Sequence, residues 1–336
     1  MPLATVPVFV EDAEAARVVL RCLESIRATE GDGLEVELVD DGSPDHAAVG
    51  LIEREATRLG CTLRRKAENT GFAATVNVGL RRCLEQARDA IIINADVEFE
   101  EPGWVARLVA QPALHRDGLA SVVGALLLYP NGSIQHAGIC RSRGGHSFRH
   151  IYKEAPADLP EAQLERSCPV TAALQFIRHE CLEDVGIYDE RFLLGFEDVD
   201  YCLRVFASGR ECVYQPAVRA VHLERRFKGG PSPKRAEWRS RSWQSFEEKY
   251  AGHDLSRHVP AGYHLEAWQL LPKLERVAER HRRTEERLAS ARRREARLVA
   301  KHAEVRRRLE RLRRSRGWRA EQRALRLWSR LRGRGR

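Results

Sequence analysis

The chain has 336 residues, a formal net charge of +9 and a mean hydropathy of −0.46. No stretch approaches ~18 consecutive apolar residues, so no membrane-spanning helix is expected. The eight cysteines form no Cys-x-x-Cys pair, which argues against a zinc ribbon or a redox motif and favours a reducing compartment. The N-terminal residues lack a basic region followed by an apolar one, so we expect no secretory signal and predict a cytoplasmic protein.

The positive charge is concentrated at the C-terminal end. Residues 273–336 hold 25 Lys and Arg against 8 Glu, whereas the preceding residues hold 32 basic and 40 acidic side chains. An anionic partner is therefore expected for the tail and not for the mildly acidic body.

The N-terminal part alternates between apolar strands and amphipathic helices. We predict strands at 6–10, 34–39, 62–65 and 90–93, and helices at 14–26, 47–59 and 73–86. Ser43 and Asp45 are alternative caps of the second helix. This alternation predicts an α/β fold with a mostly parallel, Rossmann-like sheet flanked by helices.

The pattern becomes mixed further along the chain. We predict strands at 121–129, 170–178, 212–214 and 218–221, helices at 180–185 and 199–208, a loop at 144–160 and a linker at 229–233.

Two helical segments are predicted at the C-terminal end. From Leu274 to Leu312 the heptad positions alternate by three and four residues, although His281 and Glu295 interrupt the seam. This pattern predicts a long helix, with a weak coiled coil and a homo-oligomer as the alternative. Residues 316–336 intersperse Trp318, Trp328 and leucines with arginines, as a basic amphipathic helix does. The predicted organisation is a domain at 1–230, a linker and helical extension at 231–272, a heptad helix at 273–315 and a basic tail at 316–336.

An acidic cluster follows an apolar run, and it places Glu197, Asp198 and Asp200 within four positions. Like charges this close raise one another's pKa unless a cation, a helix N-terminus or a ligand lies among them. The simpler interpretation is the acidic first turn of a helix, with Asp200 facing Arg204 four residues on.

Other polar residues follow the predicted strands, where ligands bind in α/β sheets. A nucleotide-sugar site needs a carboxylate for a divalent metal on the diphosphate and another to take the proton of an acceptor hydroxyl. Asp41, Asn94 with Asp96, the acidic cluster and His222 supply these groups.

A series of motifs then occurs in one order along residues 5–230. It comprises the strand 6–10, Asp40-Asp41-Gly42-Ser43, Asn69-x-Gly71-Phe72 with Asn77 and Gly79, Asn94-Ala95-Asp96, the segment 131–138, the segment 186–190, Glu197-Asp198-Val199-Asp200 with Arg204, and Val221-His222. In this order they resemble the family 2 glycosyltransferases, which have the GT-A fold. Gln135-His136-Ala137-Gly138 and the stretch after His222 are similar to the bacterial rhamnosyltransferase-like or O-antigen branch.

The resemblance implies a role for each matching residue. Asp198 would be the general base, and Glu197 would orient substrate hydroxyls. Asp96 and His222 would bind Mg²⁺ or Mn²⁺. The nucleotide would be bound by Asp41, with Glu11 or Asp12 assisting, and by Asn69, Gly71, Asn77 and Asn94.

The chain departs from the family pattern in three places. Asn94 replaces the first acid of the Asp-x-Asp motif, Phe9-Val10 replaces the usual Tyr-Asn, and Ile187-Tyr188 replaces Gly-Phe. Each motif also has a structural interpretation: Asp40–Ser43 as a turn with a helix cap, Asn69–Gly71 as a plain turn, and His222 as a structural histidine.

The resulting hypothesis is an inverting, metal-dependent glycosyltransferase that moves a sugar from a nucleotide-sugar donor to a glycan or lipid-linked acceptor. The basic tail would bind an anionic membrane surface at the inner face, or else pair with the acidic body. No specific nucleic-acid partner is expected, because no nucleic-acid-binding module is recognised. The enzyme alternative is a nucleotidyltransferase, but no glycine-rich phosphate loop follows Val10. The non-enzyme alternative is a catalytically degenerate scaffold that uses the tail to recruit partners.

Overall fold

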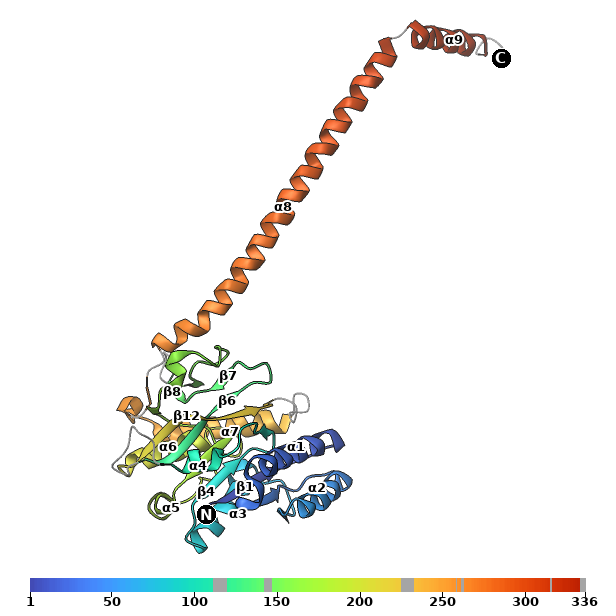
Figure 1. Ribbon diagram of the computed structural model, residues 1–336. Helices are drawn as coiled ribbons and strands as arrows, with labels where there is room; N and C mark the ends of the chain where they lie inside the picture. The colour runs from blue at the N-terminus through green and yellow to red at the C-terminus, as the bar shows by residue number, and fades with distance from the viewer. Residues whose placement is uncertain are drawn as a thin grey trace. The chain divides into compact units, whose positions relative to one another are not determined.

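The computed structural model describes residues 1–110, 120–141, 147–224, 233–257, 259–260, 263–314 and 316–332. The chain divides into two compact units, Met1–Gln269 and Leu270–Arg336 (Figure 1). Each unit is described by itself below.

The first unit contains a ten-stranded sheet in the order β10-β12-β6-β11-β4-β1-β2-β3, with β5 on β12 and β7 on β6. A separate hairpin pairs β8 with β9. The strands are β1 (Leu3–Val8), β2 (Glu35–Asp40), β3 (Thr62–Arg65), β4 (Ala90–Ile93), β5 (Val97–Glu98), β6 (Ala120–Leu128), β7 (Ile134–His136), β8 (Ile139–Arg141), β9 (Phe148–His150), β10 (Arg166–Ser167), β11 (Leu174–Ile177) and β12 (Glu211–His222).

Helices cover both faces of this sheet. Ile91 and Ile93 of β4 face a core shared with α1, α2 and α4, whereas Ala90 and Ile92 face a core shared with α3, α5 and α6. The helices of the first unit are α1 (Ala13–Glu30), α2 (His46–Arg58), α3 (Phe72–Glu85), α4 (Trp104–Val109), α5 (His179–Val185), α6 (Glu197–Ala207) and α7 (Pro233–Tyr250). The predicted α/β architecture, with helices on both sides of the sheet, is confirmed.

The sheet is mixed, and the predicted parallel order holds only for part of it. Strands β4, β1, β2 and β3 pair in parallel, as do β6 and β12. Strand β11 is antiparallel to both β4 and β6, so it joins the two parallel parts. Sequence periodicity identifies strands but not their direction, which explains the difference.

Other boundaries also differ from the prediction. The two strands expected at 212–214 and 218–221 are one strand, β12, whose pairing with β6 shifts between Gln215 and Arg219. Pro216 lies within this irregularity, and a proline donates no backbone hydrogen bond to a neighbouring strand. The expected loop at 144–160 includes β9. The strand expected at 170–178 is shorter in the structure, where only Leu174–Ile177 form β11. Most of the linker expected at 229–233 lies outside the described residues, and α7 begins at Pro233.

Helix α7 belongs to the first unit, although the sequence analysis placed it in the linker and helical extension. Phe246 of α7 is 3% exposed and packs in a small core with Phe192, Val199 and Leu203. The hydroxyl of Ser242, also on α7, accepts a hydrogen bond from the backbone N–H of Leu194 at 3.1 Å. These contacts tie α7 to the loop that precedes the acidic cluster.

All eight cysteines lie in the first unit and are buried as free thiols. Burial raises the pKa of Cys83 and of Cys168 to about 12. They therefore act as small apolar side chains.

The second unit comprises most of α8 (Tyr263–Arg314) and α9 (Arg316–Arg332). The predicted long helix is present, and Figure 1 shows α8 as one continuous helix. The apolar heptad residues Leu288, Leu298, Val305, Leu309 and Leu312 are each at least half exposed. Of the described helices, none combines the length and the apolar character that a membrane span requires.

Candidate active site

Three adjoining pockets form one cleft at the carboxyl ends of β1, β2 and β4. Their volumes are about 300, 210 and 360 Å³, and we call them the first, second and third pocket. Phe9 and Phe72 line both the first and the second pocket, and Asn94 and His222 line both the second and the third. Arg239 of α7 lines the first and the third. The predicted position of the site, at the carboxyl ends of strands, agrees with this cleft.

Asp41 lies in the wall of the first pocket, directly after β2. Its Oδ1 accepts hydrogen bonds from Lys66 Nζ at 2.7 Å and from the backbone N–H of Thr70 at 3.0 Å. Its Oδ2 accepts one from the N–H of Gly71 at 3.0 Å. The carboxylate, which is 6% exposed, is thus oriented rigidly on the pocket edge.

Gly71 and Asn69 shape the same edge. Gly71 has φ of +99°, and a Cβ there would lie 2.7 Å from the carbonyl oxygen of Leu193, so no side chain fits. This close approach joins the start of α3 to the loop before the acidic cluster. Asn69 lines the first pocket, and its buried Oδ1 has no hydrogen-bond partner among the described residues.

Two residues predicted to bind the nucleotide lie elsewhere. Asp12 caps α1, accepting a hydrogen bond from the N–H of Ala15 at 2.7 Å, and it lines none of the three pockets. Asn77 is fully buried, and its amide bonds the backbone of Tyr188 and the carboxylate of Glu190. Both side chains are occupied in holding the fold together. Glu11, the alternative to Asp12, does line the first pocket.

Asp96 and His222 meet at the second pocket, as their predicted shared role requires. Asp96 Oδ1 lies 3.1 Å from His222 Nε2, and each residue is 8% exposed. Asn94 lies beside them, with its Nδ2 at 3.4 Å from His222 Nε2. The other ring nitrogen, His222 Nδ1, donates to Gln135 Oε1 at 2.7 Å, and Gln135 Nε2 donates to Glu224 at 3.2 Å.

The side chains of these residues are suitable ligands for a divalent ion, provided that a diphosphate supplies the remaining ligands. Within the described part of the chain, no group of three His, Cys, Asp or Glu side chains could hold a metal by itself. Asp96 offers a carboxylate oxygen, and the buried Oδ1 of Asn94 has no hydrogen-bond partner among the described residues. With His222 they supply two oxygens and one nitrogen, so substrate oxygens would have to complete the shell.

The acidic cluster begins α6, and its three carboxyls have different surroundings. Glu197 lines the third pocket, is 8% exposed, and has an Oε2 without a hydrogen-bond partner among the described residues. Burial, with the charge of Asp198 as the second cause, raises the pKa of Glu197 to about 8.

Asp198 is held by the backbone. Its Oδ2 accepts from the N–H of Ala172 at 3.3 Å and its Oδ1 from the N–H of Val199 at 2.8 Å. Burial raises the pKa of Asp198, and these hydrogen bonds act in the opposite direction because they favour the ionised form. Asp198 itself lines none of the three pockets. Thr171, whose side chain bonds Asp198, lines the third pocket.

Asp200 has the structural role that the sequence suggested. It is fully buried and bonds Arg204 Nε at 3.0 Å, as predicted from their spacing. Lys249 Nζ at 2.6 Å and the hydroxyl of Tyr250 at 2.8 Å, both from α7, complete its surroundings.

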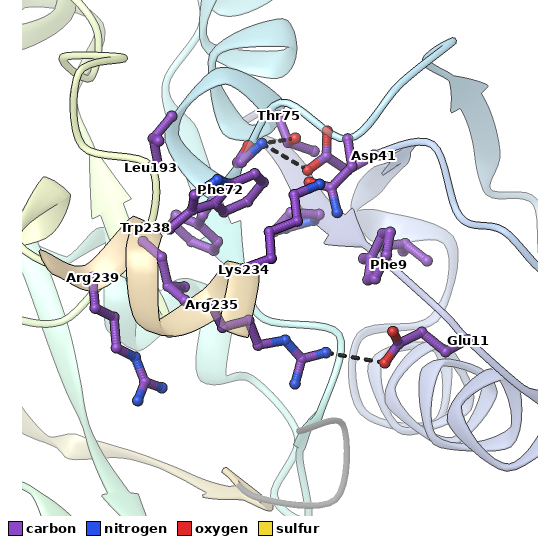
Figure 2. Close-up of a pocket in the computed structure, with 15 residues that line it drawn as sticks. Phe9, Glu11, Asp41, Phe72, Thr75, Leu193, Lys234, Arg235, Trp238 and Arg239 are labelled. Carbon is purple, nitrogen blue, oxygen red and sulfur yellow. Dashed lines mark hydrogen bonds and ion pairs between the residues drawn. The ribbon is translucent and has the colours of Figure 1, made fainter. Parts of the chain in front are cut away.

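Sequence reasoning missed the contribution of α7 to the cleft. Lys234, Arg235, Trp238 and Arg239 line the first pocket, and Arg235 bonds Glu11 at 3.1 Å across it (Figure 2). Among the described residues, the Lys and Arg side chains of the three pockets all come from this helix. The helical spacing of Ser242, Phe246 and Tyr250 is the signal that could have predicted a packed helix here.

His150 and Gln135 were also missed as parts of the site. Both line the third pocket. His150 fell within the loop expected at 144–160. The pairing of β8 with β9 brings it to the pocket, and this pairing is not visible in the local sequence.

The structure thus combines an α/β fold with a cleft at the carboxyl ends of its strands, and the carboxyl of Glu197 lines this cleft. Residues 4–137 match the family model described as glycosyl transferase family 2. The match covers 134 of the 336 residues, and over them the chain is similar to the family that its ordered motifs resemble.

Two curated relatives have informative names. The O-antigen biosynthesis protein RfbC of Myxococcus xanthus is 34% identical over 140 residues, which are 40% of this chain and 11% of that protein. The N-acetylglucosaminyl-diphospho-decaprenol L-rhamnosyltransferase of Mycobacterium tuberculosis strain CDC 1551 / Oshkosh is 25% identical over 228 residues, 60% of this chain and 70% of that one. The chain spans only 25% and 11% of the length of the two relatives that lead the comparison.

A solved structure, the mannosyltransferase PcManGT of Pyrobaculum calidifontis in complex with GDP-Man and Mn²⁺, aligns with 82% of this chain and 79% of its own. The identity is 18% and the TM-score 0.47, too low a likeness to bear on the site.

Proposed function

We propose that the protein is an inverting, metal-dependent glycosyltransferase, which transfers a sugar from a nucleoside diphosphate donor to a glycan or lipid-linked acceptor. The observation that carries this proposal is the set of groups that line three adjoining pockets of one cleft. Asp41 and Asn69 line the first pocket, Asp96 with His222 the second, and Glu197 the third. Such a donor likewise has three parts, a nucleoside, a diphosphate and a sugar, and each part would occupy one of these pockets.

The nucleoside would occupy the first pocket. Phe9, Phe72 and Trp238 give it apolar walls, and Asp41 and the unpartnered Oδ1 of Asn69 accept hydrogen bonds from ribose or base. Asp12 and Asn77 are not part of this proposal, because their side chains serve the fold.

The diphosphate would lie between the second pocket and α7. Among the described residues, four carboxylates line the cleft, namely Glu11, Asp41, Asp96 and Glu224, and they would repel the donor in the absence of cations. Lys234, Arg235 and Arg239 of α7 supply positive charge from the protein. A divalent ion held by Asp96, Asn94 and His222 would neutralise the leaving diphosphate.

Of the two adjacent carboxyls, Asp198 would take the proton from the acceptor hydroxyl. The pKa of about 8 keeps Glu197 protonated near neutral pH, so that it can donate a hydrogen bond to a sugar oxygen. The N–H groups of Ala172 and Val199 favour the charged form of Asp198. We therefore assign the base to Asp198 and the orienting role to Glu197, with in-line attack and inversion at the anomeric carbon.

The acceptor and the tail would act together at a membrane. The two named relatives belong to O-antigen synthesis and to transfer onto a decaprenol-linked sugar, which supports a cell-surface glycan as the product. Helix α9 exposes Trp318, Leu325 and Trp328 among arginines, as helices at an anionic lipid surface do. The proposed site of action is the cytoplasmic face of the membrane.

Donor binding tests the proposed function. Calorimetry with UDP-, dTDP- and GDP-sugars, with and without Mn²⁺, would be run on the native protein, Asp96→Ala and Asp198→Asn. We expect metal-dependent binding of one nucleotide class, lost in Asp96→Ala and retained in Asp198→Asn. A folded protein that binds none of these donors would contradict the proposal and favour the scaffold.

A further inference from the structure

Two histidines make direct contact beside the third pocket. His136 ends β7 and is fully buried, and His150 ends β9. Their Nδ1 atoms are 2.7 Å apart, and the rings meet edge to face with centroids 4.9 Å apart. Only one proton can lie between two nitrogens at this distance, so the pair has a defined donor and a defined acceptor.

The backbone determines which ring is the donor. His136 Nε2 faces the N–H of Gly138 at 3.3 Å and the N–H of Thr171 at 3.4 Å, and both can only donate to it. Nε2 therefore carries a lone pair. Burial lowers the pKa of His136 well below its usual value, with the charges of His150 and His222 as smaller causes, so the ring is neutral. Its single proton must be on Nδ1, directed at His150.

Gly138 permits the backbone conformation on which this arrangement of His136 depends. Its φ is +100°, and a Cβ at this position would lie 2.4 Å from Cys168 Sγ. A glycine is required for the backbone N–H to approach His136 in this conformation. The motif Gln135-His136-Ala137-Gly138 thus contains both the ring and the backbone donor that orients it.

The tautomer of His150 follows from that of His136. Because His150 Nδ1 accepts the proton of His136, the proton of a neutral His150 is on Nε2. Burial, with the positive charge of Lys153 as the second cause, lowers the pKa of His150 to about 4, although the charge of Glu224 opposes this shift. At neutral pH His150 is therefore an uncharged N–H donor.

His150 lines the third pocket together with Glu197 and Thr171. We propose that His136 fixes His150 as a hydrogen-bond donor to a sugar oxygen bound in the third pocket, which makes His150 a specificity-determining residue and His136 a positioning residue. The sugar is that of the donor or that of the acceptor. The sugar contact rests on the function proposed above, whereas the tautomer pattern does not.

The tautomers can be measured directly. Long-range ¹H–¹⁵N spectra of ¹⁵N-histidine-labelled native protein at pH 7 report which ring nitrogen carries the proton, and His136→Gln and His150→Gln assign the signals. We expect the proton on Nδ1 of His136 and on Nε2 of His150. A charged His150, or one protonated on Nδ1, would overturn the proposal even if the protein proved to be a glycosyltransferase.

Substrate contact is tested with His150→Leu, which removes the donor, and His150→Gln, which retains an N–H. Calorimetry would compare each UDP-, dTDP- or GDP-sugar with its free nucleoside diphosphate, and transfer to alkyl monosaccharides would be assayed in parallel. The control is His179→Gln, since His179 lies on α5, pairs with Glu183 and lines none of the three pockets.

If His150 contacts the sugar of the donor, the native protein binds the sugar nucleotide more tightly than the free nucleoside diphosphate. His150→Leu should then lower the ratio of these two affinities about tenfold. An acceptor contact predicts unchanged donor binding and a KM for the alkyl monosaccharide about tenfold higher. His150→Gln should retain most of the affinity in either case. If the donor binds and His150→Leu changes neither the affinity ratio nor the KM more than His179→Gln does, the sugar contact is contradicted. If no donor binds to any variant while the tautomers are as expected, the proposed function fails and the histidine pair stands.

The positioning role is tested by a double-mutant cycle. His136→Leu should weaken the same step as His150→Leu, but it should have no further effect in the His150→Leu background, because it acts only through that ring. Additive effects would contradict a positioning role. Melting temperatures would confirm that the variants are folded, and His136→Gln would replace His136→Leu if the latter is not.

Discussion

Asp198 and Glu197 are neighbours in the sequence, but the structure surrounds their carboxyls differently. Backbone N–H groups bond Asp198, whereas Glu197 has an unpartnered oxygen at the third pocket. We predict that Asp198→Asn lowers kcat about 10²- to 10⁴-fold with little change in donor affinity, as expected for the loss of a general base. Glu197→Gln, which keeps a hydrogen-bond donor, should lower kcat less. Single-turnover kinetics would measure both, and the reverse order would make Glu197 the base.

The raised pKa of Glu197 also predicts a pH dependence of stability. Its pKa in the folded state, about 8, is above the ordinary value of 4.5, so its contribution to stability is complete below pH 4.5 and is lost as the pH rises through 8. Glu197→Gln cannot ionise and should avoid this loss. We expect the variant to unfold like the native protein near pH 4.5 and to be more stable by about 5 kcal/mol at pH 9. Denaturant unfolding at both pH values measures the difference, and a constant difference would refute the assignment.

At the scale of elements, α7 supplies the Lys and Arg side chains that line the cleft among the described residues. Arg239 is shared by the first and third pockets, whereas Arg241 of the same helix pairs with Glu237 at 3.7 Å and is 61% exposed. We predict that Arg239→Gln weakens binding of nucleoside diphosphates about tenfold and leaves nucleosides unaffected. Arg241→Gln is the matched control. Calorimetry at low and high salt would measure both, and equal effects of the two changes would contradict the prediction.

Helix α9 offers a second test at this scale. Trp318, Leu325 and Trp328 are spaced to share one face, and Leu327, nine residues from Trp318, is on the opposite face. Replacing Trp318 and Trp328 by Ser should reduce binding to phosphatidylglycerol vesicles, since the rings supply the apolar part of the interaction. Leu327→Ser should have little effect. Co-sedimentation measures the bound fraction, and binding that survives the double change would point to charge alone.

For the whole molecule, the cleft and the basic tail belong to different units. The residues of the three pockets all lie within Met1–Gln269. A chain that ends at Gln269 should therefore bind donor with the affinity of the full chain, while losing any binding to anionic vesicles. Calorimetry and vesicle sedimentation test the two parts independently. Loss of donor binding in a folded truncated chain would show that residues 270–336 contribute to the site.

Local patterns predicted much of this molecule. The apolar runs and helical spacing of the N-terminal part identified β1 to β4 and α1 to α3, because each element buries one regular face. The mixed direction of the sheet was not predictable in this way. Strand β11 reads as a buried strand in either direction, and only its pairing with β4 and β6 determines the choice.

The candidate site was predictable where a polar residue lies at or just after the end of a strand. Asp41, Asp96 and His222 were found by this rule and lie in the cleft. Asn69 and Asn77 belong to the same predicted motif, yet Asn69 lines a pocket whereas Asn77 bonds the backbone of Tyr188. Contacts distant in sequence determine this difference. His150 and Arg239 were missed for the same reason: strand pairing and helix packing bring them to the cleft.

The buried cysteines have a practical consequence for labelling. The thiolate is the form that attacks thiol reagents, and burial both shields these eight side chains and raises the pKa of Cys83 and Cys168 to about 12. A single cysteine introduced at an exposed position such as Ser290 of α8 should therefore react with a maleimide dye far faster than the native thiols. The protein can then carry one fluorophore on its long helix without the removal of any cysteine from its core.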